Sequence, residues 1–283
     1  MPWYILATIC TLAVSIANII SRAMLKDDES DPIGFSIVFT FLLSVMSFIF
    51  SFMIGRFYLP PIDKLFFPFA AAVLLWALWT VIYFKGVKLL GAGEVAILSS
   101  LGIFFLVILG IIFFHEKIST IQIVGIFLIV LSSCLIIFEH LSFKSKKGII
   151  LIIISSFVSS VAIMMDTIVI RQYDSFSYLS IASFFVALVL LAIFPKRIKT
   201  FAILKDRWNG PKIILYSFFW TTQSATYYLA LQGGAKVSLL APFVRSSGVI
   251  IIILAFLFLK ERKYIKRKII ASIITLIGLI LLK

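Results

Sequence analysis

One feature constrains this chain more than any other: a single sequence pattern occurs twice. The first copy runs from Trp76 to Glu116 and the second from Trp220 to Glu261. In each copy a tyrosine, Tyr83 or Tyr227, stands 7 residues after the tryptophan. A glycine-containing turn, an apolar run and a glutamate beside basic residues then follow in the same order. Such self-similarity indicates that the chain consists of two related halves.

The apolar runs of the chain are long enough to cross a lipid bilayer. Hydrophobic residues make up 62% of the chain and charged residues 13%, whereas a soluble domain is about a quarter charged. Breaks at charged and Gly/Pro clusters leave ten apolar spans, each with roughly the 20 residues that a tilted transmembrane helix needs. The spans are 3–24, 35–58, 66–84, 94–114, 118–138, 148–169, 176–195, 211–231, 237–259 and 264–282. The predicted fold class is therefore an all-α integral membrane protein.

The number of spans predicts how the two halves are related. Five spans precede the basic segment 144–147 and five follow it, so we expect one repeat at 1–143 and a second at 144–283. Because five is odd, the second copy must enter the membrane from the opposite side. The prediction is ten transmembrane helices arranged as two inverted five-helix repeats, an architecture in which the substrate site lies near the membrane midplane.

Lys and Arg lie mainly between the spans, so the formal net charge of +14 predicts contact with lipid headgroups and not with nucleic acid. Six basic residues lie on the side that carries both termini and nineteen on the opposite side. The positive-inside rule therefore predicts both termini outside. The longest link, 196–212, is basic with scattered apolar residues and predicts either a short helix on the membrane surface or a disordered loop.

The sequence predicts neither a cofactor nor a metal site. Cys10 and Cys134 fall within apolar spans and lack metal-ligand spacing. No Gly-rich phosphate-binding loop is present, which argues against ATP-driven transport by this chain alone. The first span begins at Trp3 without a basic segment before it, and we expect it to be retained and not cleaved as a signal.

Charged residues inside the spans are the first candidates for a functional site, because charge within a membrane is costly and commonly functional. Asp166 and Arg245 reach similar depths from the same side of the membrane, which predicts an ion pair. Arg22 and Glu94 occupy the repeat-related spans on the opposite side. We expect the two pairs to act as gates on opposite faces, the alternative being interfacial, solvated side chains.

Aromatic residues provide the second set of candidates. An i, i+3, i+7 spacing places each set on one face of its helix, and such a face is suited to line a cavity for cations or planar groups. The two sets are Trp76, Trp79 and Tyr83 in one span and Trp220, Gln223 and Tyr227 in its counterpart. Asn18 in the first span joins them as a candidate binding residue. The alternative for the tyrosines near span ends is an interfacial aromatic belt.

The ends of the two copies carry one further pattern. Glu116 follows Phe-Phe-His and precedes Lys, and Glu261 follows Phe-Leu-Lys and precedes Arg, each with another apolar run beyond it. With ten spans in two halves, the chain resembles the drug/metabolite transporter superfamily, specifically its EamA-type ten-helix transporters, over essentially its whole length. The resemblance marks both glutamates as recurrent, and we interpret them as loop-anchoring ion pairs. It also implies cytoplasmic termini, in contrast to the charge count.

Together these features predict a secondary transporter that works by alternating access and is not an enzyme. The expected substrate is a small polar or amphipathic metabolite such as an amino acid or amine, with export as one direction. We expect a multi-pass protein of a prokaryotic-type plasma membrane, monomeric or homodimeric, whose partners are this small molecule and the bilayer. The alternatives are a non-transporting scaffold or channel subunit and, third, a membrane-embedded lipid-modifying enzyme.

Overall fold

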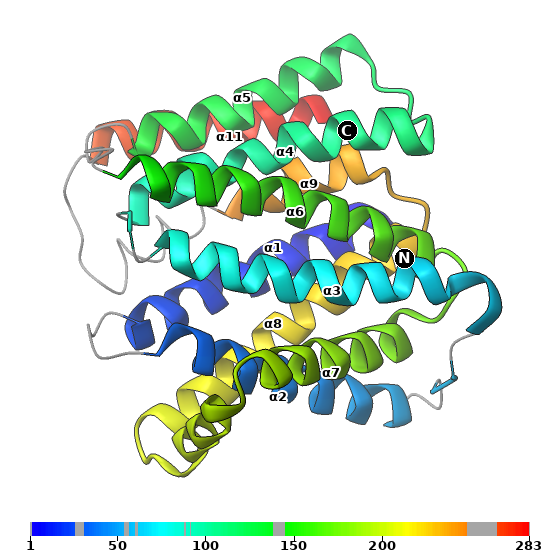
Figure 1. Cartoon of the computed structure of the whole chain (residues 1–283). Coiled ribbons are helices and arrows are strands. Elements are labelled where there is room, and N and C mark those ends of the chain that lie inside the picture. Colours follow the sequence, from blue (N-terminus) through cyan, green and yellow to red (C-terminus); the bar gives the residue numbers. More distant parts are fainter. Residues whose placement is uncertain are drawn as a thin grey trace. The chain divides into compact units, whose positions relative to one another are not determined.

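The computed structural model describes residues 2–25, 31–53, 57–59, 62–87, 89–90, 92–137, 145–247 and 265–282. Within these ranges all regular secondary structure is helical (Figure 1). The α-helices are α1 (Trp3–Leu25), α2 (Pro32–Met53), α3 (Ile62–Val87), α4 (Ala92–Phe114), α5 (Thr120–Ile137), α6 (Lys146–Ile170), α7 (Ser175–Ile193), α8 (Asn209–Gln232), α9 (Val237–Arg245) and α11 (Ile265–Leu282). Part of the predicted span 237–259 lies outside the described residues. The all-α prediction is confirmed.

Apolar length and local capping explain where these helices begin and end. Among the described residues, four helical segments are long and apolar enough to cross a membrane: Ile33–Met53, Lys64–Tyr83, Lys146–Ile170 and Ser175–Ile193. Shorter apolar segments are Trp3–Ala17, Leu101–Phe114, Thr120–Ser132 and Ile273–Leu282. At the start of α7, the carboxylate of Asp174 accepts the backbone N–H of Ser177 at 2.9 Å, which satisfies a donor that a helix start leaves open.

The link before α8 forms a 3₁₀ helix, η2 (Pro195–Lys205), which has no buried residue. The short helix predicted between 196 and 212 is therefore present. Arg197 forms an ion pair with Asp31, beside the start of α2, with 2.6 Å between Nη1 and Oδ2. Asp206 accepts the backbone N–H groups of Trp208 at 2.8 Å and Asn209 at 2.6 Å. These donors, that of Asn209 most strongly, lower the pKa of the Asp206 carboxyl.

The contacts divide the chain into two compact units that differ from the sequence halves. The first comprises Met1–Val81 and Val161–Gly234, and the second comprises Ile82–Ser160 and Ala235–Lys283. Each unit therefore draws helices from both halves. The boundaries at 81/82 and 160/161 fall within α3 and α6.

In the first unit α2 packs against α7 through small hydroxyl side chains. Ser44 Oγ donates to the carbonyl of Ser180 at 2.7 Å, and Ser51 lies 3.5 Å from Ser177, hydroxyl to hydroxyl. The partner on α7 moves backward as the residue on α2 moves forward, so the two helices are antiparallel. Small residues allow such close helix packing in membranes, and the hydroxyl bonds add to it.

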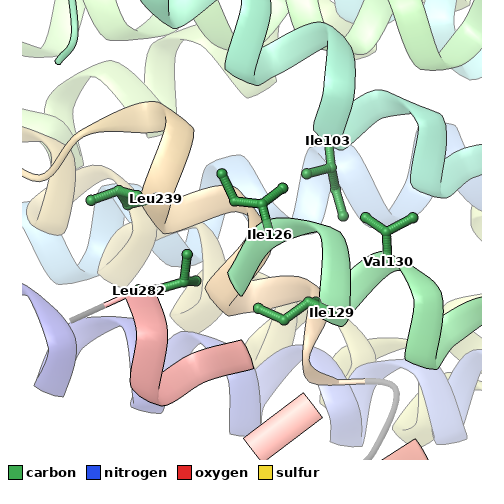
Figure 2. Packing of buried hydrophobic residues seen from close by; sticks show 6 residues of the cluster. All are labelled: Ile103, Ile126, Ile129, Val130, Leu239 and Leu282. Atoms are coloured by element: carbon green, nitrogen blue, oxygen red, sulfur yellow. The ribbon is translucent and has the colours of Figure 1, made fainter. Parts of the chain in front are cut away.

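In the second unit α5 packs against α11, beside a core that α4 and α9 complete. Figure 2 shows this core, which consists of Ile103, Ile126, Ile129, Val130, Leu239 and Leu282. The two backbones approach so closely that a Cβ added at Gly125 would lie 2.8 Å from the carbonyl oxygen of Gly278. The hydroxyls of Ser132 and Thr275 lie 2.6 Å apart. The order of these contacts again makes the helices antiparallel.

These two helix pairs show how the repeats are related. In a chain of two five-helix copies, α7 is the counterpart of α2 and α11 is the counterpart of α5. Each therefore packs on its own counterpart, and in both pairs the counterparts run in opposite directions (Figure 1). A repeat inserted the same way round would make them parallel. The packing within each unit therefore confirms the inverted repeat.

Candidate functional site

A buried carboxylate marks the candidate site in the first compact unit. Asp166 lies on α6, and its exposed fraction is 0%. Removing a carboxylate from water is costly unless hydrogen bonds compensate the charge, and within a membrane such residues are usually functional.

Three side chains from three other helices donate hydrogen bonds to this carboxylate. Trp76 on α3 donates from Nε1 to Oδ2 at 2.9 Å, and Tyr228 on α8 donates from its hydroxyl to the same oxygen at 2.7 Å. Tyr178 on α7 donates its hydroxyl to Oδ1. Four helices of one unit, α3, α6, α7 and α8, thus meet at a single charged group. We call these four residues the Asp166 network.

Aromatic packing holds the donors of the Asp166 network in place. The rings of Tyr178 and Tyr228 pack edge to face with centroids 5.7 Å apart, and Phe69 packs on Tyr178 at 5.9 Å. Trp79 packs perpendicular to Trp76 with centroids 5.4 Å apart. Edge-to-face packing of this kind is favourable and directional. The donors are therefore positioned by their rings before any ligand arrives.

The aromatic residues predicted to line one cavity lie in several different environments. Trp76 belongs to the Asp166 network, with Trp79 packed beside it. Tyr227 is buried, and its ring lies 6.2 Å from that of Tyr228. Tyr83 is in the second unit, where it packs against the buried pair Leu98 and Ile152.

The two remaining predicted residues on α8 face other helices. Trp220 packs on Phe39 of α2 at 6.0 Å and on Tyr216 at 5.7 Å. Gln223 donates from Nε2 to the sulfur of Cys10 on α1 at 3.6 Å. Of the predicted aromatic and polar residues, Trp76 hydrogen-bonds directly to a charged group, the carboxylate of Asp166.

The four remaining predicted residues lie outside the described side chains. They are Asn18, Arg22, Glu94 and Arg245. The ion pairs Asp166–Arg245 and Arg22–Glu94 therefore stay predictions.

Tyr178 is a member of the network that was not predicted. It lies in the first turn of α7, in a segment rich in serine, and it belongs to none of the predicted aromatic sets. A tyrosine with 0% exposure in an apolar helix needs a partner for its hydroxyl. That requirement was the available signal, but sequence alone does not identify the acceptor.

The second unit contains a different carboxylate arrangement at Glu116, directly after α4. Its Oε1 accepts the backbone N–H of Val237 at 2.9 Å, and its Oε2 accepts that of Ser238 at 3.0 Å and also the Ser238 hydroxyl. These are donors of the first turn of α9. The glutamate of the repeated pattern therefore anchors its loop as a helix cap, through backbone donors and a hydroxyl. The ion pair expected for it stays a prediction.

The backbone turn between α4 and Glu116 directs the Glu116 carboxylate towards the start of α9. His115 has a positive φ of 50°, and the backbone N–H of Glu116 returns to the carbonyl of Gly110 at 3.3 Å. A Cβ added at Gly110 would lie 2.8 Å from Oε2 of Glu116. The glycine therefore leaves the space that the capping carboxylate occupies.

Comparison with known proteins agrees with this architecture. The model of the EamA-like transporter family matches residues 1–138 and again residues 146–283. One solved crystal structure superposes with a TM-score of 0.80 at 11% sequence identity, covering 98% of this chain and 94% of that one, which is a likeness of fold. No curated protein matches.

The two matches define a class, a multi-pass helical membrane transporter built from two repeats. Because they cover nearly the whole sequence, the chain belongs to the EamA-like transporter family.

Proposed function

We propose that this protein is a secondary transporter that moves an amino acid, an amine or a related small metabolite by alternating access. Family membership supports transport of the drug/metabolite kind. The substrate class rests on the chemistry of the first unit, where a carboxylate is surrounded by indole and phenol rings. Carboxylates pair with ammonium groups, and aromatic faces attract cations.

The observation that carries the proposal is the Asp166 network. A buried carboxylate that accepts three hydrogen bonds from three other helices is a costly arrangement if its only task is packing. Transporters built from inverted repeats need a polar centre within the membrane to bind their substrate. In this protein it lies towards the ends of α6 and α8 and the start of α7. The predicted pairs Asp166–Arg245 and Arg22–Glu94 complete the proposal as gates on the two membrane faces, in a prokaryotic-type plasma membrane.

Thermal stabilisation of the purified protein tests the substrate class. The panel contains amino acids, amines, nucleosides and sugars, and the protein is examined as wild type, Trp76→Ala, Arg245→Leu and Asp174→Asn. We expect amines or amino acids to raise the melting temperature of the wild type and of Asp174→Asn, which keeps a good helix cap, but not of the other two variants.

A ligand is then tested for saturable uptake into vesicles. Stabilisation that survives both Trp76→Ala and Arg245→Leu contradicts the assigned site. Binding without saturable uptake favours the scaffold or channel alternative.

A further inference from the structure

We propose that Asp166 is the proton-binding residue that couples transport to a proton gradient. This inference rests on the proposed function, because coupling has meaning only in a transporter. It goes beyond that function by naming the coupling ion and the atom that binds it.

The hydrogen bonds leave one position on the carboxylate open. An ionised carboxylate offers about four lone-pair sites. Oδ2 accepts two hydrogen bonds, from Trp76 and Tyr228, and Oδ1 accepts one, from Tyr178. Among the described residues, therefore, Oδ1 keeps an unused site that can take a proton.

The three hydrogen-bond donors around Asp166 leave room for a proton but do not provide the ligands that a metal cation needs. Sodium-like and divalent ions need several oxygen ligands at once. The groups around Asp166 are an indole N–H and two phenol O–H groups, all of which direct hydrogens at the carboxylate. No cluster of three or more His, Cys, Asp or Glu side chains occurs in the described part of the chain. A proton needs one lone pair and no such shell.

The chemical step is a simple protonation. A proton from water at the open membrane face adds to Oδ1 and converts the carboxylate to a neutral carboxylic acid. The hydrogen bonds from Tyr178, Tyr228 and Trp76 then lose their charge assistance and weaken. Because these donors sit on three different helices, protonation loosens the contact of α6 with α3, α7 and α8 together. Loss of the proton to the other side restores the charge and the three bonds.

The titratable groups that face Asp166 are the phenols of Tyr178 on α7 and Tyr228 on α8, with Tyr227 beside Tyr228. On α3 the facing group is the indole of Trp76, which does not titrate. Arg245 is the predicted charged partner, and its side chain lies outside the described residues. A phenol releases its proton only well above neutral pH, about 10 in model peptides. The carboxyl is therefore the group of the network that changes charge.

The first test needs no substrate. Infrared difference spectra are recorded between acidic and alkaline pH for the protein in lipid vesicles. The other carboxyl groups of the chain absorb in the same region, so the spectrum of each variant is subtracted from that of the wild type. We expect the wild type minus Asp166→Asn spectrum to contain the carbonyl band of one buried carboxylic acid, and the wild type minus Asp174→Asn spectrum to lack a band at that frequency. An unchanged band in Asp166→Asn overturns the proposal. If Asp166→Asn does not fold, Tyr178→Phe serves instead, because removing the donor on Oδ1 must move the pH midpoint of the band.

The second test uses a ligand found by the stabilisation panel. A pH difference of one unit across the vesicle membrane, with one proton per substrate, drives about tenfold accumulation. We expect this accumulation in the wild type and Asp174→Asn and its loss in Asp166→Asn. Tenfold accumulation by Asp166→Asn overturns the assignment of Asp166 as the proton-binding residue and leaves the transporter proposal intact. Absence of any uptake overturns the transporter proposal, while the infrared band still decides whether Asp166 takes a proton.

Discussion

Asp166 and Glu116 are both buried carboxylates, and each accepts three hydrogen bonds from the residues described here. Their donors differ in kind. Two of those of Glu116 are backbone N–H groups at the start of α9, which every helix leaves unsatisfied at its N-terminus. Those of Asp166 are side chains on three separate helices. A backbone cap persists as long as its helix exists, whereas side-chain bonds between helices break when the helices move.

The difference separates a carboxylate whose contacts explain a structural role from the one that we propose to be functional. Glu116 carries the pattern that the sequence repeats, yet its contacts explain a helix cap and need no substrate. Asp166 belongs to no repeated pattern and lies at the meeting point of four helices. In this protein the repeated residue maintains the fold, and the unrepeated one is the better candidate for transport.

The largest effect is expected for Asp166→Leu. The substitution leaves three donors without their acceptor, and each unsatisfied buried donor costs about 1–3 kcal/mol. We expect uptake to be lost and the melting temperature to fall clearly. Asp166→Asn keeps an acceptor oxygen and costs less stability. If Asp166→Leu folds with wild-type stability and uptake, the Asp166 network contributes neither to stability nor to transport.

The next effect is expected for Glu116→Ala. Loss of the cap of α9 should cost about 1–2 kcal/mol of stability, measured by thermal unfolding in detergent. Glu116→Gln keeps one acceptor oxygen and should cost about half of this. Transport per folded molecule should stay at the wild-type level in both variants, because we assign the substrate site to the Asp166 network and not to the cap. A large change in the substrate KM of Glu116→Gln would erase the distinction drawn between the two carboxylates.

A smaller effect is expected when one donor of the network is removed. Tyr228→Phe deletes one of the two hydrogen bonds on Oδ2 while the ring packing on Tyr178 remains. A hydrogen bond to a charged group contributes about 1.5–3 kcal/mol, part of which the second donor on that oxygen retains. We expect a shifted pH profile of uptake with a nearly unchanged maximum rate. Tyr216→Phe, in the separate aromatic cluster, is the matched control and should leave the pH profile unmoved.

The smallest effect is expected for Asp206→Asn. Asp206 uses backbone donors as Glu116 does, but it is fully exposed. Because its pKa is lowered on folding, its contribution to stability is present above the ordinary pKa of about 3.9 and is lost as pH falls through the lowered value. The wild type should therefore lose slightly more stability than Asp206→Asn when the pH falls below about 4. Equal acid sensitivity of the two proteins would show that these bonds do not stabilise the fold.

Much of the fold follows from the sequence, since apolar length determines which segments become membrane helices. An odd number of spans in each copy then requires the inversion that the antiparallel pairs α2–α7 and α5–α11 show. The two compact units were not predictable in this way. They join helices from both halves. The close contacts between those helices, such as Ser44–Ser180 and Gly125–Gly278, cannot be derived from the number and length of the spans.

The site was predictable in part. Asp166 and Trp76 stand out in the sequence because a charge and an indole inside apolar spans each need a partner. Their pairing does not follow from spacing, because the two residues lie 90 positions apart. Tyr178 was missed because a lone tyrosine near a helix start is typical of an interfacial belt, and only the packing of α7 reveals it as buried. Helical periodicity predicts which side chains share one face of a helix, but not which residues of other helices that face contacts.

The different roles of Asp166 and Glu116 can be compared in a single experiment. Substrate accumulation per folded molecule is measured in vesicles under a pH gradient for Asp166→Asn and Glu116→Gln, with unfolding temperatures recorded in parallel. The two variants make the same change, from a carboxylate to an amide. We expect Asp166→Asn to lose accumulation, and Glu116→Gln to lose stability and keep accumulation. The opposite pattern, with accumulation kept in Asp166→Asn and lost in Glu116→Gln, would contradict this expectation.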